Sequence, residues 1–383
     1  MWIFKLLLHF LMQPALWVCI LVTFGMYQHR IKNERKHFRI AINRDFYEGR
    51  HLVKNGLFLG AVGSALTLIV GLTVPMQWAV TYEVLLCLGL LLLLVVDSGV
   101  LGLIMSLPLL FLFQQTGLSK QFFFKAVDID GWLLLDSGSS IFALCALFFL
   151  FRYFMLRRVD QFTLTPSIHN GKRGRRLIQY TWHEAALVPL LVLIPGNLFH
   201  SMFSFWPFLS IHGQTFELFI LPFGVTAAVK FWRRPLQTAI KKVQQQTLFL
   251  AICSFVFGII SFFWSQLTIV GLMILLFLAG AQVFSRTKKE KRAGRWYAET
   301  NSGVRVIAIQ PHTPAAKMNL SIGDVIVSCN GVSVANENEL YAALKLDSTY
   351  CRFRVQTYQG DLKLAESAIF ADSPHELGLI IFH

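Results

Sequence analysis

Two short patterns in the chain contain residue types that hydrolases use for catalysis. In the first, His183-Glu184-Ala185-Ala186-Leu187, the opening pair matches the HExxH motif of zinc proteases. That motif needs a second histidine four residues further on, so that both imidazoles face the metal from one side of a helix. Leu187 stands at that position, and leucine has no atom that binds zinc. The sequence therefore argues against a metalloprotease.

The second pattern is Gly138-Ser139-Ser140, whose serines would need a histidine base at the same depth in the fold. No histidine is expected there, and small residues of this kind favour close helix packing in membranes. Asp136 is the acidic residue that lies deepest in an apolar segment, and its role is left open. We predict no catalytic residue, no metal ligand and no cofactor, and hence a protein that is not an enzyme.

Composition places the chain among membrane proteins. Of its 383 residues, 55% are hydrophobic and 15% are charged, whereas a soluble protein has about 25% charged residues. The segment before Trp296 holds 29 Lys/Arg and 12 Asp/Glu, a net charge of +17, and the remainder holds 6 and 9, a net charge of −3. The positive charge lies in short loops between apolar segments, which indicates contact with the lipid bilayer and argues against nucleic acid as a partner.

Nine apolar segments approach the length of about 20 residues that a membrane-spanning helix needs. They are residues 6–27, 57–74, 79–96, 99–113, 132–154, 185–205, 215–232, 247–264 and 267–285. Four connections carry 8, 7, 4 and 6 Lys/Arg respectively, namely residues 28–56, 152–184, 233–246 and 286–295. Because basic loops stay in the cytoplasm, we predict an external N-terminus and a cytoplasmic C-terminal domain. Segment 99–113 is short and contains Pro108, so it could instead be tilted or re-entrant.

The chain divides into a multi-span membrane domain (1–285), a basic juxtamembrane linker (286–295) and a small α+β domain (296–383). In the last part, GVRVIAI predicts a strand, AAKMNL a short helix, and Asn330-Gly331 a hairpin turn. ENELYAAL predicts a second helix that Asn336 caps, and CRFRVQTY and LKLAESAIF predict two further strands.

This order of elements, together with TPAAKMNLSIGDVIVSCNGVSV, resembles the bacterial PDZ family of peptide-binding domains. The family holds a peptide carboxylate with free amides of a glycine-containing loop, and the peptide adds a strand to an open sheet edge beside a helix. The only such loop stands at the end of the chain, so the resemblance implies a circularly permuted PDZ domain. The predicted peptide-binding residues are Leu377, Gly378, Leu379 and Ile380 from this loop and strand, with Glu337, Tyr341 and Leu344 from the helix. The alternative is that LGLIIF forms only a terminal core strand.

The whole organisation resembles the MinJ family of division-site proteins in Gram-positive bacteria. The resemblance is carried by the loop sequence RIKNERKHF (30–38), by Pro14 in the first span and by the ending HELGLIIF. It implies a non-catalytic adaptor in the bacterial cell membrane, enriched at septum and poles, that links DivIVA-like to MinD-like division proteins. One alternative is a regulator of membrane proteolysis or a degenerate intramembrane protease, and another is a transporter with a regulatory module.

Overall fold

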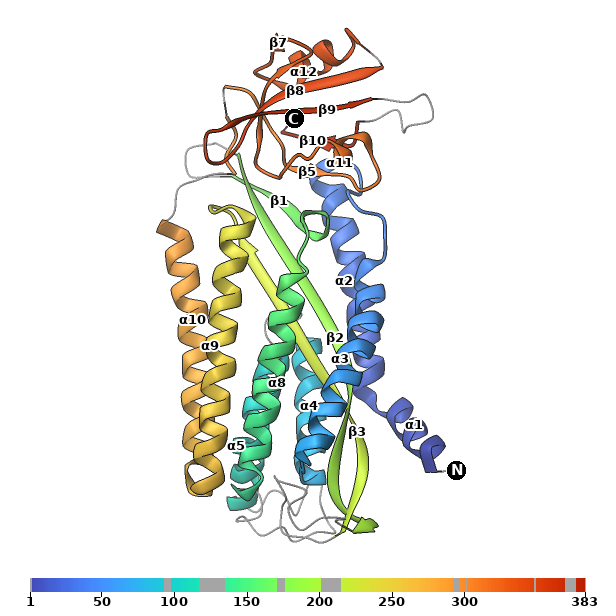
Figure 1. Cartoon of the computed structure of the whole chain (residues 1–383), viewed down its shortest axis with the longest axis vertical. Helices are drawn as coiled ribbons and strands as arrows, with labels where there is room; N and C mark the ends of the chain where they lie inside the picture. The colour runs from blue at the N-terminus through green and yellow to red at the C-terminus, as the bar shows by residue number, and fades with distance from the viewer. Residues whose placement is uncertain are drawn as a thin grey trace.

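The structure, a computed structural model, consists of an elongated bundle with a small domain at one end (Figure 1). It describes residues 2–92, 98–116, 135–170, 176–200, 215–292, 297–300, 302–347, 349–368 and 377–382. The bundle helices are α1 (Trp2–Met12), α2 (Pro14–Phe38), α3 (Tyr47–Val70), α4 (Met76–Leu92), α5 (Ser98–Gln115), α8 (Gly138–Arg157), α9 (Leu236–Phe263) and α10 (Thr268–Arg292).

Four of the described helices are long and apolar enough to cross a membrane: α3, α8, α9 and α10. The pair α1 and α2 meets at a bend of 53° before Pro14 and makes a fifth if it is taken as one broken span. Helices α4 and α5 are shorter and pack against each other. Helix α10 continues beyond the apolar segment to Arg292, so that the start of the predicted linker is helical, while residues 293–296 lie outside the described part.

Two of the nine predicted spanning helices, at 185–205 and 215–232, are wrong, because the described residues 185–200 and 215–231 form long strands. Residues 201–205 of the first segment lie outside the described part. Strands β2 (Arg176–His200) and β3 (Thr215–Phe231) pair antiparallel, and the short strand β1 (Thr165–Asn170) extends the sheet beside β2. A continuous apolar run has no period that separates a buried strand from a buried helix. Proline favours strands here, since Pro189, Pro195 and Pro222 would each cost about 3 kcal/mol inside a helix.

The prolines fit the ladder because their nitrogen atoms point away from the partner strand. Pro189 lies opposite Pro222 in the register, and the carbonyl of Pro189 is bonded outside the sheet, by the hydroxyl of Ser64 at 3.2 Å. Main-chain groups alternate in direction along a strand, so odd-numbered residues of this part of β2 face outward. Proline at these positions removes no hydrogen bond between β2 and β3.

Helix α3 satisfies the outward edge of β2. The hydroxyl of Ser64 accepts from the amide of Leu191 at 3.0 Å, and Thr67 donates to the carbonyl of Leu191 at 2.6 Å. Further along, Leu193 exchanges main-chain bonds with Leu72 and Val74. Glycines bring the helix this close: a Cβ on Gly56 would overlap the carbonyl oxygen of Leu187.

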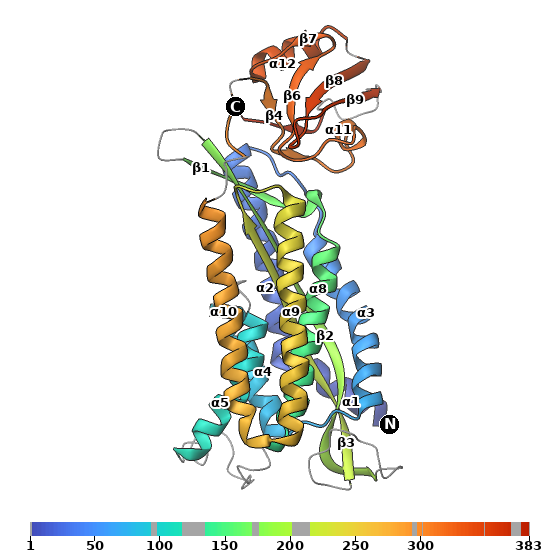
Figure 2. The ribbon, with the colours of Figure 1, turned by 60° about the vertical axis from the view of Figure 1, so that its left-hand side comes forward.

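The opposite edge, on β3, is bonded by side chains of α4 and of the break before α2. The amide of Gly224 donates to the hydroxyl of Tyr82 at 3.0 Å, and Gln13 donates to the carbonyl of Ile220 at 3.0 Å. Non-helical backbone is tolerated at membrane depth only where protein covers it. Figures 1 and 2 show helices beside most of the hairpin, whose end far from the PDZ domain extends beyond them.

A buried ion cluster holds the connection between α2 and α3. Arg30 donates to Glu48 at 2.6 Å and to Glu34 at 3.4 Å, and all three side chains are almost wholly buried. Arg30 also donates to the carbonyl of Asn43, and its guanidinium lies 4.5 Å from the ring centroid of Tyr47. Part of the predicted basic loop, residues 28–56, is therefore a buried cluster of opposite charges.

The small domain follows the predicted order of elements, except that the single strand predicted for GVRVIAI is two short strands in different sheets. It contains β4 (Val304–Arg305), β5 (Ala308–Ile309), α11 (Pro314–Lys317), β6 (Val325–Cys329), β7 (Val332–Ser333), α12 (Glu337–Leu344), β8 (Tyr350–Gln356), β9 (Leu362–Ala368) and β10 (Leu379–Ile380). Strands β4, β6, β8 and β9 form one sheet, and β5 pairs with β10. Asn330 and Gly331 both have positive φ, at 49° and 85°, as their hairpin turn requires.

Candidate peptide-binding groove

Strand β10 presents an edge to which an extended peptide could pair. Its Ile380 carbonyl accepts from the amide of Ile307, and the Gly378 carbonyl accepts from Gln310, both at 2.8 Å. Because direction alternates along a strand, the main-chain groups of Leu379 and Ile381 point the other way. Within the described residues, no main-chain bond joins either residue to a segment on that side.

The loop before β10 requires glycine at position 378. Gly378 has φ +79°, a left-handed conformation that strains any residue with a side chain, and a Cβ there would overlap Thr313. The preceding residue, Leu377, is held by its carbonyl, which accepts from the amide of Ala315 at 3.1 Å. The loop thus has a fixed shape at the start of β10.

Helix α12 is the other predicted wall of the groove, and its position is set by capping and packing. Asn336 accepts from the amide of Glu339 at 2.9 Å. Leu340 is buried in the domain core, to which Ile381 also belongs. The three predicted binding residues lie on one side of α12, with Glu337 and Leu344 half-buried and Tyr341 49% exposed.

A cavity of about 200 Å³ lies beside the start of α12 and Phe382, and the bundle contributes to it. Its lining includes Glu337, Phe382, Arg305, Arg176 and Glu299. Arg176 of β2 bonds to Glu299 at 2.7 Å and lies 5.4 Å from the Phe382 ring centroid. Burial lowers the pKa of Arg305, which donates to two main-chain carbonyls. A peptide that reached this cavity would therefore meet charged groups of both signs.

The small domain is docked on the end of β2. The amide of Ile178 donates to the carbonyl of Tyr297 at 3.0 Å, and the hydroxyl of Tyr180 donates to the carbonyl of Ile307 at 2.7 Å. The rings of Tyr180 and Tyr297 lie 4.7 Å apart. Since Ile307 also bonds to β10, the bundle and the strand of the groove share a partner.

Comparison with known proteins agrees with this architecture. Residues 282–364 match the PDZ domain family. The chain is 24% identical over 385 aligned residues to the cell division topological determinant MinJ of Bacillus subtilis (strain 168), covering 97% of this chain and 92% of that protein. The chain is a MinJ homologue with a C-terminal PDZ domain. It is also 31% identical over 222 residues to probable MinJ proteins of Lacticaseibacillus paracasei and Lacticaseibacillus casei (strain BD-II), covering 57% of this chain and 58% of each.

In this MinJ homologue the HExxH-like pattern lies on a strand. His183 and Glu184 are neighbours in β2, so their side chains point to opposite faces of the sheet. Glu184 is buried and accepts from Asn55 at 2.6 Å, with His51 at 3.2 Å. Within the described residues, no group of three or more His, Cys, Asp or Glu is placed to hold a metal ion. The geometry gives the protease alternative no support.

The serine pattern and Asp136 lie at the start of α8, at the end of the bundle far from the PDZ domain (Figure 1). A Cβ on Gly138 would overlap Thr268 of α10, so the glycine permits close packing of the two helices. Asp136 is exposed.

Proposed function

We propose that the chain is a non-catalytic topological determinant of cell division that binds partner proteins through its PDZ domain. The similarity to MinJ over 97% of the chain carries this proposal. The finer part of the proposal is that the partners are DivIVA-like and MinD-like proteins and that the chain is enriched at the septum and poles.

The mechanism is the addition of a peptide strand to β10. The outward amide and carbonyl groups of Leu379 and Ile381 would pair with the peptide backbone, while Leu344 and Tyr341 would contact its side chains. A PDZ domain built in this way is circularly permuted, because its binding strand follows the rest of the domain.

The arrangement of the bundle supports a cytoplasmic PDZ domain. The described residues of the connections 28–56, 152–184 and 233–246 and the end of α10 all lie toward the PDZ end (Figures 1 and 2). The hairpin of β2 and β3 returns the chain to the side from which it came, as two helices would. Basic loops on the same side of the membrane must be separated by an even number of crossings, and the hairpin keeps that number even. The N-terminus is then outside.

Localisation tests the division role. A fluorescent fusion of the full chain, expressed in a Bacillus subtilis strain that lacks its own MinJ, is expected to collect at septa and poles. Deletion of the chain in its host should lengthen cells. Uniform membrane fluorescence together with normal cell length after deletion would contradict the proposal.

Replacing Tyr341 by alanine tests the groove, because this side chain is half-exposed on α12 and stays out of the core. We expect the full-length Tyr341→Ala protein to bind immobilised C-terminal peptides of division proteins about tenfold more weakly, the loss typical of one aromatic contact. Tyr358→Ala, at the turn between β8 and β9, removes an exposed tyrosine elsewhere and should leave binding unchanged. Equal affinity for both variants would mean that β10 is only a core strand.

A further inference from the structure

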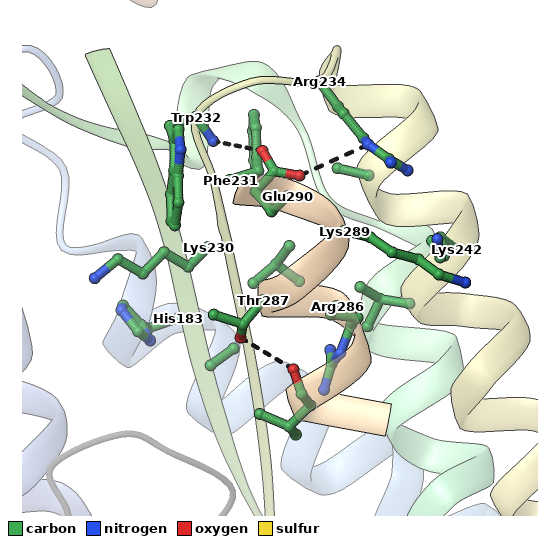
Figure 3. Close-up of a pocket in the computed structure, with 15 residues that line it drawn as sticks. His183, Lys230, Phe231, Trp232, Arg234, Lys242, Arg286, Thr287, Lys289 and Glu290 are labelled. Carbon is green, nitrogen blue, oxygen red and sulfur yellow. Dashed lines mark hydrogen bonds and ion pairs between the residues drawn. The ribbon is translucent and has the colours of Figure 1, made fainter. Parts of the chain in front are cut away.

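A cavity opens between β3, α9 and α10 near the PDZ end of the bundle (Figure 3). Its volume is about 340 Å³. Five cationic side chains line it: Lys230, Arg234, Lys242, Arg286 and Lys289. The floor is apolar, formed by residues such as Ala228, Ala239, Val243 and Val283. The cavity therefore combines a positive rim with a hydrocarbon base.

Glu290, the only carboxylate among the described lining residues, is already engaged. It accepts from the amides of Trp232 at 3.0 Å and Arg233 at 2.7 Å, and it lies 3.8 Å from Arg234. Lys242 interacts electrostatically with two other cations, Lys289 and Arg234, and with the carboxylate of Glu290. Cationic side chains outnumber this one carboxylate among the described lining residues, so an anion entering the cavity would be stabilised.

A second cavity, of about 510 Å³, continues from the first along the same two helices. Val283, Arg286 and Thr287 line both. Apolar residues form the larger part of the second cavity's lining: Val100, Leu101, Phe149, Leu250, Leu276, Ala279, Gly280, Val283 and Phe284. Six polar residues complete it: Arg152, Gln246, Thr247, Gln282, Arg286 and Thr287. An apolar tail could extend from the basic rim toward the middle of the bundle.

We propose that the two cavities together bind one anionic phospholipid of the leaflet on the PDZ side. Its phosphate would lie beside Lys242 and Lys289, and an acyl chain would follow α10 past Gly280. Basic pockets between membrane helices on the cytoplasmic side suit anionic head groups. The apolar extension favours a lipid over free phosphate, because phosphate has no hydrocarbon to place in it.

The contribution of the basic side chains to lipid binding is tested by a double variant of the full chain, Lys242→Ala with Lys289→Ala. Binding is measured by native mass spectrometry in detergent, with phosphatidylglycerol as the anionic probe and phosphatidylcholine as the zwitterionic one. The Kd for phosphatidylglycerol should rise about thirtyfold, as expected for two basic contacts to anionic lipid. The pair Lys241→Ala and Lys288→Ala is the matched control, since it removes the same charge from the neighbouring positions of the same helices, outside both cavities. Equal losses for the two pairs would overturn the proposal.

The place of the acyl chain in the second cavity is tested by Gly280→Leu, which leaves every charged side chain unchanged. A Cβ on Gly280 meets nothing within 4 Å, so the leucine enters the second cavity without a clash at its root. Phosphatidylglycerol binding should fall, whereas Gly25→Leu on α2, another open position, should have no effect. Millimolar inorganic phosphate should fail to displace the lipid. Unchanged binding by Gly280→Leu, or full displacement by phosphate, would assign the rim to a soluble anion and refute the lipid site.

Discussion

Gly56→Ala is expected to destabilise the full-length protein by roughly 1–3 kcal/mol, the cost of forcing extra volume into a packed interior. A methyl group at this position overlaps the carbonyl oxygen of Leu187, which belongs to the backbone of β2 and has no flexible end to move. Either α3 or the strand must shift, and a shift loosens the bonds that Ser64 and Thr67 make to the same edge. Denaturant unfolding in detergent micelles measures the change.

Gly25→Ala is a control that should change the free energy of unfolding in the opposite direction. Gly25 lies on α2, is exposed, and has nothing within 4 Å of a built Cβ. Replacing a helical glycine by alanine there should stabilise the protein by about 0.5–1 kcal/mol through the backbone alone. If both variants were stabilised, α3 would not press against β2 as described.

Arg30→Ala is expected to cost about 3–5 kcal/mol, because it leaves the buried carboxylates of Glu34 and Glu48 without their partner. Arg35→Ala removes the same charge from an exposed position of the same helix and should change stability by less than about 0.5 kcal/mol. Unfolding of the full chain in detergent compares the two.

Neutralising the whole cluster gives a second measure of the same interaction. A triple variant with Arg30→Met, Glu34→Gln and Glu48→Gln leaves no buried charge, so it should regain much of the stability lost in Arg30→Ala. A triple variant less stable than the single one would show that the carboxylates stabilise α2 and α3 independently of Arg30.

The helices and the PDZ domain were accessible to sequence analysis, and the hairpin was not. ENELYAAL forms α12 with the expected cap because capping and i, i+4 spacing are local signals. The strands β2 and β3 are as apolar as spanning helices, and the prolines Pro189, Pro195 and Pro222 are the local signal that favours strands. Their edges are satisfied by residues more than a hundred positions away, such as Ser64 and Tyr82, which no local pattern indicates.

The candidate sites differ in the same way. Gly378 and the apolar run after it are visible in the sequence, and they suggest a strand that follows a glycine-containing loop. The contribution of Arg176 to the groove is not visible in the sequence, because it depends on docking of the PDZ domain against β2. The lipid cavity brings together β3, α9 and α10, and the sequence indicates only that each is basic near one end.

The covered hairpin also bears on how the protein is made. A two-stranded ribbon leaves its outer main-chain groups without partners, and hydrocarbon supplies none. Gln13, Ser64, Thr67 and Tyr82, which provide those partners, all precede β2 in the chain. Because synthesis starts at the N-terminus, the helices that carry these residues are made before the two strands. The strands can therefore leave the translocation machinery directly onto helices that are already in the bilayer.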